Sequence, residues 1–160
     1  MGARKNSCVN TARIAQRGRA EPAFTEKLRL RGAAQAIQRE VPPGEAVFHA
    51  SWAVFTQLFF LAPTHDYVVG LDPTFFAVHD PALYRRYELL RTGRDEQGQP
   101  LTRPERIIRE EFGMAFALVL PAVEHRLAFE LRRAHTAGRI TLRARHPKDR
   151  WRLYDLRPPR

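Results

Sequence analysis

Three short apolar runs, separated by helical sequence, constrain the fold of this chain more than any other feature. They cover residues 46–50, 67–71 and 114–120. Nearly continuous apolar runs of this length are typical of strands that are buried on both faces of a parallel sheet. The segments between them have helical periodicity and are long enough for the crossovers that parallel strands need. The pattern therefore predicts an α/β fold.

The end of the chain predicts a different kind of pairing. Apolar and polar residues alternate over 140–145, Pro147 lies in a turn sequence, and an apolar segment returns at 151–156. This pattern is typical of two antiparallel strands joined by a short turn. We therefore expect a small three-layer Rossmann-like sandwich of about five strands, mostly parallel, with an antiparallel hairpin at one edge.

The domain organisation follows from where the periodicity begins. Residues 1–23 are polar and basic and lack periodicity, which predicts a disordered tail. Residues 24–160 are expected to form a single α/β domain, which is a sufficient length for one core. Its leading helix should span 24–40 and end before the Pro42-Pro43-Gly44 sequence, because proline cannot continue a helix.

Local signals predict where later helices begin. Asp80 followed by Pro81 indicates a capped helix start. Thr102 and Glu105 have the spacing of a capping box. Residues 122–137 should form an amphipathic helix with Val123 on its apolar face.

The charge of the chain lies mainly at its two ends. The formal net charge is +10, and arginine supplies most of the basic side chains. Residues 1–40 carry nine basic and three acidic side chains, and residues 139–160 carry eight and two, whereas the middle is slightly acidic. Such ends could contact phosphates of nucleic acid or lipid headgroups, or could reflect an arginine-rich coding bias. The sequence leaves both readings open.

Several function classes lack their motifs. The turn after the first apolar run contains no glycine, and neither a P-loop, a serine-hydrolase elbow nor a paired-cysteine zinc pattern occurs. Cys8 is the single cysteine, so no intrachain disulfide is expected. We predict no cofactor and no metal. No signal peptide or membrane span is apparent, which predicts a cytoplasmic chain unless it belongs to a larger or split membrane protein.

Candidate site residues follow the ends of the first two predicted strands, where open α/β sheets bind ligands. His49 and Trp52 follow the first strand, His65 precedes the second, and Asp72 follows it. We predict that these four are ligand-binding residues. The alternative is structural, with Ser51 as a helix cap and Asp72-Pro73 as a turn.

An aromatic stripe shares this region. Trp52, Phe55 and Phe59 recur at helical spacing, which favours core packing over a stacking platform for a sugar or base.

One block of the sequence contains Pro42-Pro43-Gly44, Val47-Phe48-His49, Trp52, Phe55, Gln57-Leu58-Phe59-Phe60, Tyr67-Val68-Val69-Gly70-Leu71-Asp72-Pro73-Thr74-Phe75, Asp80-Pro81 and Leu83-Tyr84. With these residues, the region from residue 42 to residue 84 resembles a group of uncharacterised bacterial polytopic membrane proteins. In that group the sequence lies in the soluble region after the last membrane helix, and the group is distantly similar to C-type glycosyltransferases that use lipid-linked sugars. The likeness covers about residues 28–156.

The chain departs from the group's pattern at two places. The group typically has acidic residues directly after the tryptophan, and a proline after the next phenylalanine. Here Ala53, Val54 and Thr56 occupy those positions. A role that needs those carboxylates is therefore not implied for this chain.

The resemblance implies an accessory domain that is not catalytic by itself and that works with a membrane-embedded glycosyltransferase-like partner or a missing upstream membrane region. One alternative is a stand-alone nucleic-acid-binding protein that uses the basic ends. A weaker alternative is a small metal-dependent hydrolase, in which His49 and Asp72 would serve as ligands or as acid and base.

Overall fold

The computed structural model of the chain describes residues 30–68 and 73–159. The predicted tail 1–23, residues 24–29 of the predicted leading helix, residues 69–71 of the second predicted strand and Asp72 lie outside the described residues. The elements, in chain order, are α3 Arg31–Glu40, β1 Ala46–Phe48, the 3-10 turn η2 Trp52–Val54, α4 Phe55–Leu61, β2 Asp66–Tyr67, α5 Pro73–His79, α6 Pro81–Thr92, α7 Pro104–Glu111, β3 Phe116–Val119, α8 His125–Thr136, β4 Thr141–Arg145 and β5 Arg152–Asp155.

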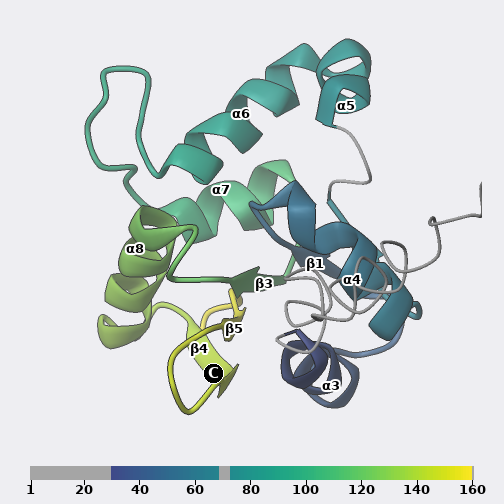
Figure 1. Cartoon of the computed structure of the whole chain (residues 1–160). Coiled ribbons are helices and arrows are strands. Elements are labelled where there is room, and N and C mark those ends of the chain that lie inside the picture. The colour runs from purple at the N-terminus through teal and green to yellow at the C-terminus, as the bar shows by residue number, and fades with distance from the viewer. Residues whose placement is uncertain (1–29, 69–72, 160) are drawn as a thin grey trace, which may run out of the picture.

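The strands form one five-stranded mixed sheet in the order β2-β1-β3-β5-β4. β1 pairs in parallel with both β2 and β3, whereas β5 is antiparallel to both β3 and β4. This confirms the predicted α/β sandwich with an antiparallel hairpin at one edge. The second strand of that hairpin lies inside the sheet beside β3, and the first strand forms the edge (Figure 1).

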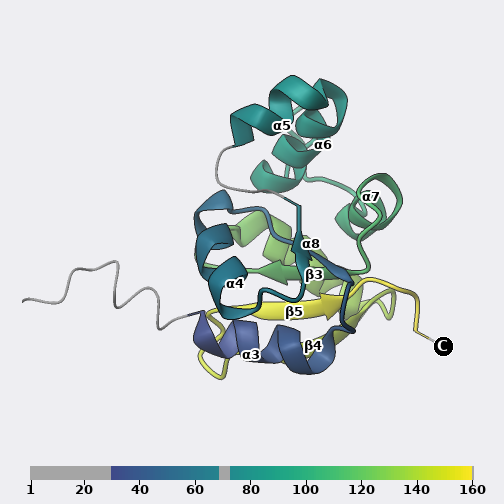
Figure 2. The same cartoon turned by 90° about the vertical axis from the view of Figure 1, so that its right-hand side faces the viewer.

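Alternate side chains of the strands support a core on each face of the sheet. On one face, Val47 and Leu118 pack in the same buried cluster as Ile37 of α3 and Leu58 of α4. Figure 2 shows α3 below the sheet and α6 above it. The two cores make the sheet the central layer, which fits strands that are apolar on both faces.

The opposite core contains three large aromatic side chains together with aliphatic ones. Phe48 and Tyr154 lie there with Tyr87 of α6, Ile108 of α7 and Leu131 of α8. All five are at most 1% exposed. The loops after β1 and β3 therefore begin at the boundary between two well-packed layers.

The caps of α6 confirm the sequence signals at that helix. Asp80 accepts a hydrogen bond from the amide of Leu83 at 2.9 Å, and Pro81 occupies the first turn. Gly93 ends the helix with φ +64°, a left-handed conformation that favours glycine. The capping box at Thr102 does not form. Arg103 is the N-cap of α7 instead, and its side chain makes no capping hydrogen bond.

Helix α5 occupies residues for which the sequence predicted only a turn. Its first residue is Pro73, which is compatible with a helix start. Phe76 points inward and makes edge-to-face contacts with Tyr84 and Tyr87, each with ring centroids 6.0 Å apart. Long-range aromatic packing of this kind has no local sequence signature, so the helix was missed.

The aromatic stripe at the start of α4 is also not the core stripe that its spacing predicted. Trp52 and Phe59 are 50% and 56% exposed, whereas Val54 and Leu58 are buried. The segment begins as the 3-10 turn η2, whose tighter winding changes which side chains face the sheet. Ser51 precedes that turn but makes no capping hydrogen bond through its side chain.

Among the residues that the structure describes, no helix combines the length and the apolar character needed to cross a membrane.

Candidate functional site

A crevice of about 300 Å³ lies at the carboxyl ends of β1 and β3. These strands are parallel neighbours, but the chain leaves them toward opposite faces of the sheet. β1 leads to α4 and the core around Leu58, whereas β3 leads to α8 and the core around Leu131. A crevice outside the carboxyl ends of two such strands is where open α/β sheets bind ligands.

Three segments line this crevice. Residues 50–52 follow β1, and Val123 and Glu124 follow β3. Helix α6 closes one side with Tyr84, Tyr87, Glu88 and Arg91. The lining therefore combines aromatic faces with a few polar groups, which is the usual composition of a small-molecule site.

Three aromatic side chains line the crevice: Trp52, Tyr84 and Tyr87. Trp52 is half exposed, and Tyr84 is partly buried and stacked on Tyr87, with ring centroids 6.2 Å apart. The Tyr87 hydroxyl is buried and donates to the Ala50 carbonyl at 2.6 Å. This bond ties α6 to the end of β1, so that the tyrosine side of the crevice is fixed by the core.

Glu124 is the unusual polar group of the crevice. Its side chain is almost fully buried, and the amide of Leu120 donates to Oε2 at 2.8 Å. Burial raises the pKa of Glu124 to about 7, against the opposing effect of the amides of Leu120, Ser51 and Ala50. Oε1 has no hydrogen-bond partner among the described residues. The carboxyl group can therefore donate or accept a proton near neutral pH.

The rim beside Glu124 carries paired charges. Arg91 donates to both carboxylate oxygens of Glu88, with its shortest contact at 2.6 Å. Because the pair is internally neutralised, the crevice carries no strong net charge of its own. Aromatic faces and a carboxyl group of intermediate pKa suit a neutral, hydroxyl-rich ligand such as a sugar better than a phosphate.

His49 lies behind the crevice. Its ring is fully buried and stacks on Phe55 with centroids 6.5 Å apart. Nδ1 lies 3.0 Å from the Ser51 carbonyl, which can only accept, so Nδ1 carries the proton. Burial lowers the pKa of His49 to about 4, although this hydrogen bond opposes the shift. His49 is therefore neutral near pH 7 and holds the turn that carries Trp52.

Of the three candidate site residues that the structure describes, Trp52 alone lines the crevice. His49 lies behind it. His65 is buried, with Nε2 3.2 Å from the Val41 carbonyl and Nδ1 3.1 Å from the Thr64 hydroxyl. Its ring thus links the segment before β2 to the end of α3. Asp72 lies outside the described residues.

Glu124 was missed because the predicted start of the last helix was three residues too early. That boundary placed Val123 on the apolar face, but α8 begins at His125 and Val123 is 61% exposed. The sequence did offer one signal. Glu124 is an acid a few residues after β3, and the carboxyl end of β3 lies beside that of β1.

Within residues 30–68 and 73–159, the structure contains no group of three or more His, Cys, Asp or Glu side chains that could hold a metal ion.

Comparison of the chain with protein-family models, with curated proteins and with solved structures finds no match in any of the three.

Proposed function

We propose that this chain is a ligand-binding accessory domain of the kind appended to glycosyltransferase-like membrane proteins, and that it is not catalytic by itself. The observation that carries the proposal is the crevice at the ends of β1 and β3, with the half-exposed Trp52 on one side and the buried Glu124 beside it. The sequence resemblance of residues 42–84 supports the same reading. The proposed ligand is the sugar part of a glycan.

The ligand fits the two kinds of group in the crevice. A sugar ring presents C–H groups on one face, which pack on aromatic rings such as Trp52. Its hydroxyl groups both donate and accept hydrogen bonds, and so does a protonated carboxyl group, the form that burial favours at Glu124. The second carboxylate of the crevice, Glu88, is held in an ion pair with Arg91, so the pair of acids supports binding more directly than hydrolysis.

Tryptophan fluorescence tests this proposal, because the two tryptophans differ in exposure. Trp52 is half exposed in the crevice, whereas Trp151 is buried in the opposite core. We expect a mannose oligosaccharide to change the emission in a saturable way. Trp52→Ala should abolish the change, and Phe60→Ala, which removes a highly exposed ring on α4, should leave it intact. A response that survives Trp52→Ala, or no response, would contradict the proposal.

The proposal includes a membrane-embedded partner. Helices α4 and α5 contain no Asp, Glu, Lys or Arg. Phe60 on α4 is 83% exposed, and Phe75 on α5 is 71% exposed. Uncharged, exposed aromatic helices support contact with another apolar surface. We expect the genome to encode several membrane helices directly beside the coding sequence of this chain. A solitary coding sequence among unrelated neighbours would count against a partner.

Binding to nucleic acid through the basic ends stays the second candidate. The structure describes seven basic residues after position 138, and four of them are in ion pairs. This pairing lowers the charge that is available to phosphates, so no observation favours the second candidate over the first. A DNA affinity that falls steeply with rising salt would reverse that order, provided that it is lost when residues 1–23 are deleted and Arg145, Lys148 and Arg150, which form no ion pair among the described residues, are replaced by glutamine.

A further inference from the structure

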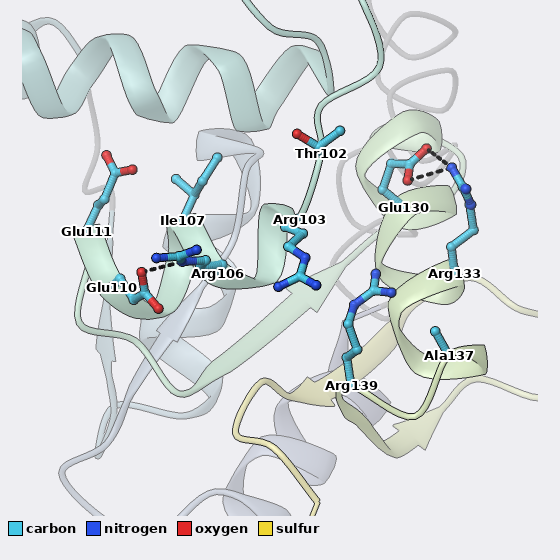
Figure 3. Close-up of a pocket in the computed structure, with 10 residues that line it drawn as sticks. All are labelled: Thr102, Arg103, Arg106, Ile107, Glu110, Glu111, Glu130, Arg133, Ala137 and Arg139. Atoms are coloured by element: carbon cyan, nitrogen blue, oxygen red, sulfur yellow. Dashed lines mark hydrogen bonds and ion pairs between the residues drawn. The ribbon is translucent and has the colours of Figure 1, made fainter.

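A second concave surface lies between α7 and α8 and shares no lining residue with the crevice. It is a groove of about 720 Å³, and four arginines line it: Arg103, Arg106, Arg133 and Arg139. Figure 3 shows the guanidinium groups of Arg103 and Arg139 projecting into this groove from the start of α7 and from the segment after α8. Guanidinium groups gathered around one groove favour an anionic ligand.

The carboxylates of the groove are already paired. Glu110 accepts from Arg106 at 2.7 Å, Glu130 contacts Arg133 at 3.2 Å, and Glu111 contacts Arg86 of α6 at 3.0 Å. In contrast, Arg103 forms no ion pair with any residue that the structure describes. The uncompensated charge of the groove is therefore positive, and it belongs to Arg103.

Arg139 is held in place from behind. Its Nε donates to Glu105 at 2.8 Å, and the Glu105 side chain is only 5% exposed. Within the described residues, the two terminal nitrogens of Arg139 make no hydrogen bond. The buried carboxylate thus orients the guanidinium and leaves its outer donors for a ligand, which is the arrangement that pre-organises a binding group.

The backbone at Arg103 is strained. Its φ and ψ are 51° and 52°, the left-handed region that disfavours residues other than glycine, asparagine and aspartate. As the N-cap of α7 it also makes no capping bond, which asparagine could provide. An arginine thus occupies a position where its backbone and its capping role both favour another residue. Strain of this kind is concentrated at functional sites.

We propose that this groove binds a phosphate-bearing ligand, with Arg103 and Arg139 donating to the phosphoryl oxygens. The planar fork of arginine matches the oxygens of a phosphate group in pairs. The phosphate could be carried by a soluble diphosphate or by a lipid headgroup. The proposal rests on the groove alone and stands or falls independently of ligand binding in the crevice.

Titration calorimetry of the full chain with inorganic pyrophosphate at low salt tests the proposal. We expect saturable binding at one site, and at least a tenfold loss of affinity in Arg103→Asn. Asparagine tolerates the left-handed conformation and can cap the helix, so the unfolding midpoint of this variant should stay the same or rise. A loss of affinity therefore cannot be attributed to unfolding. Arg150→Asn, which removes the same charge from the β4–β5 turn, should bind as the unaltered chain does.

Cosedimentation with vesicles distinguishes the two sources of phosphate. A lipid headgroup predicts that phosphatidylglycerol vesicles, but not phosphatidylcholine vesicles, retain the chain and that Arg103→Asn releases it. A soluble ligand predicts binding of pyrophosphate alone. The proposal is overturned if neither probe binds, or if Arg103→Asn and Arg150→Asn weaken binding equally.

Discussion

The crevice and the arginine groove hold polar groups in opposite ways. In the crevice, Glu124 and the nearby His49 are buried without a charged partner, and burial shifts both pKa values toward the neutral forms. In the groove, most charges are exposed and paired, as Arg106 and Glu110 are. Buried unpaired groups couple strongly to folding, whereas exposed pairs contribute little. Stability and its pH dependence should therefore depend on the crevice and hardly on the groove.

The largest expected effect that tests this contrast is a change in the pH dependence of stability. Glu124→Gln should remove the part of that dependence that Glu124 causes. The folded pKa of Glu124 is about 7, above the ordinary value of 4.5. As the pH rises, the unfolded chain loses this proton first. The contribution of the Glu124 proton to the free energy of unfolding is therefore complete below pH 4.5 and is lost as the pH rises through 7. The shift corresponds to roughly 3 kcal/mol. The free energy of unfolding of Glu124→Gln minus that of the unaltered chain should therefore increase by about this much from pH 4 to pH 8.

Urea unfolding at pH 4, 6 and 8 measures this difference. His49 acts in the opposite sense, because its folded pKa of about 4 lies below its ordinary 6.5. Its contribution is complete above pH 6.5 and is lost as the pH falls toward 4. The two effects partly cancel between pH 4.5 and 6.5, so the difference between the two proteins, rather than either curve, isolates Glu124. Parallel curves for both proteins would contradict the raised pKa.

A smaller effect is expected when the tie between α6 and β1 is removed. Tyr87→Phe leaves the Ala50 carbonyl without its buried donor. This should lower the free energy of unfolding by about 1–3 kcal/mol. Tyr84→Phe is the matched control, because the Tyr84 hydroxyl makes no hydrogen bond among the described residues. Denaturant unfolding checks both variants, and equal losses would show that the Tyr87 bond is unimportant.

The smallest effect belongs to the groove. Arg106→Gln breaks an exposed pair one helical turn apart on α7, with a separation of 2.7 Å. We expect no measurable shift of the thermal unfolding midpoint, because solvent screens such pairs and ordering both side chains costs entropy. A shift as large as that of Tyr87→Phe would remove the contrast between the two regions.

The sequence predicted the layers of the fold better than it predicted the crevice. Continuous apolar runs identified β1 and β3, and the Asp80-Pro81 signal located α6, because buried strands and helix caps have local signatures. The exposure of Trp52 depended on a 3-10 turn, and the burial of Glu124 depended on where α8 begins. Neither boundary has a strong local signal. A shift of a few residues decides which side chains line a crevice, so the strands could be predicted while most of its lining could not.

An amide-resolved NMR titration with a mannose oligosaccharide tests most directly whether the crevice is the sugar site. Ligand binding there predicts saturable shifts of the amides of Ser51, Trp52 and Glu124, which line or border the crevice, with the groove amides of Arg106 and Arg133 unchanged. Spectra that do not change on titration, or shifts confined to the groove, would contradict the assignment of the crevice as the ligand site.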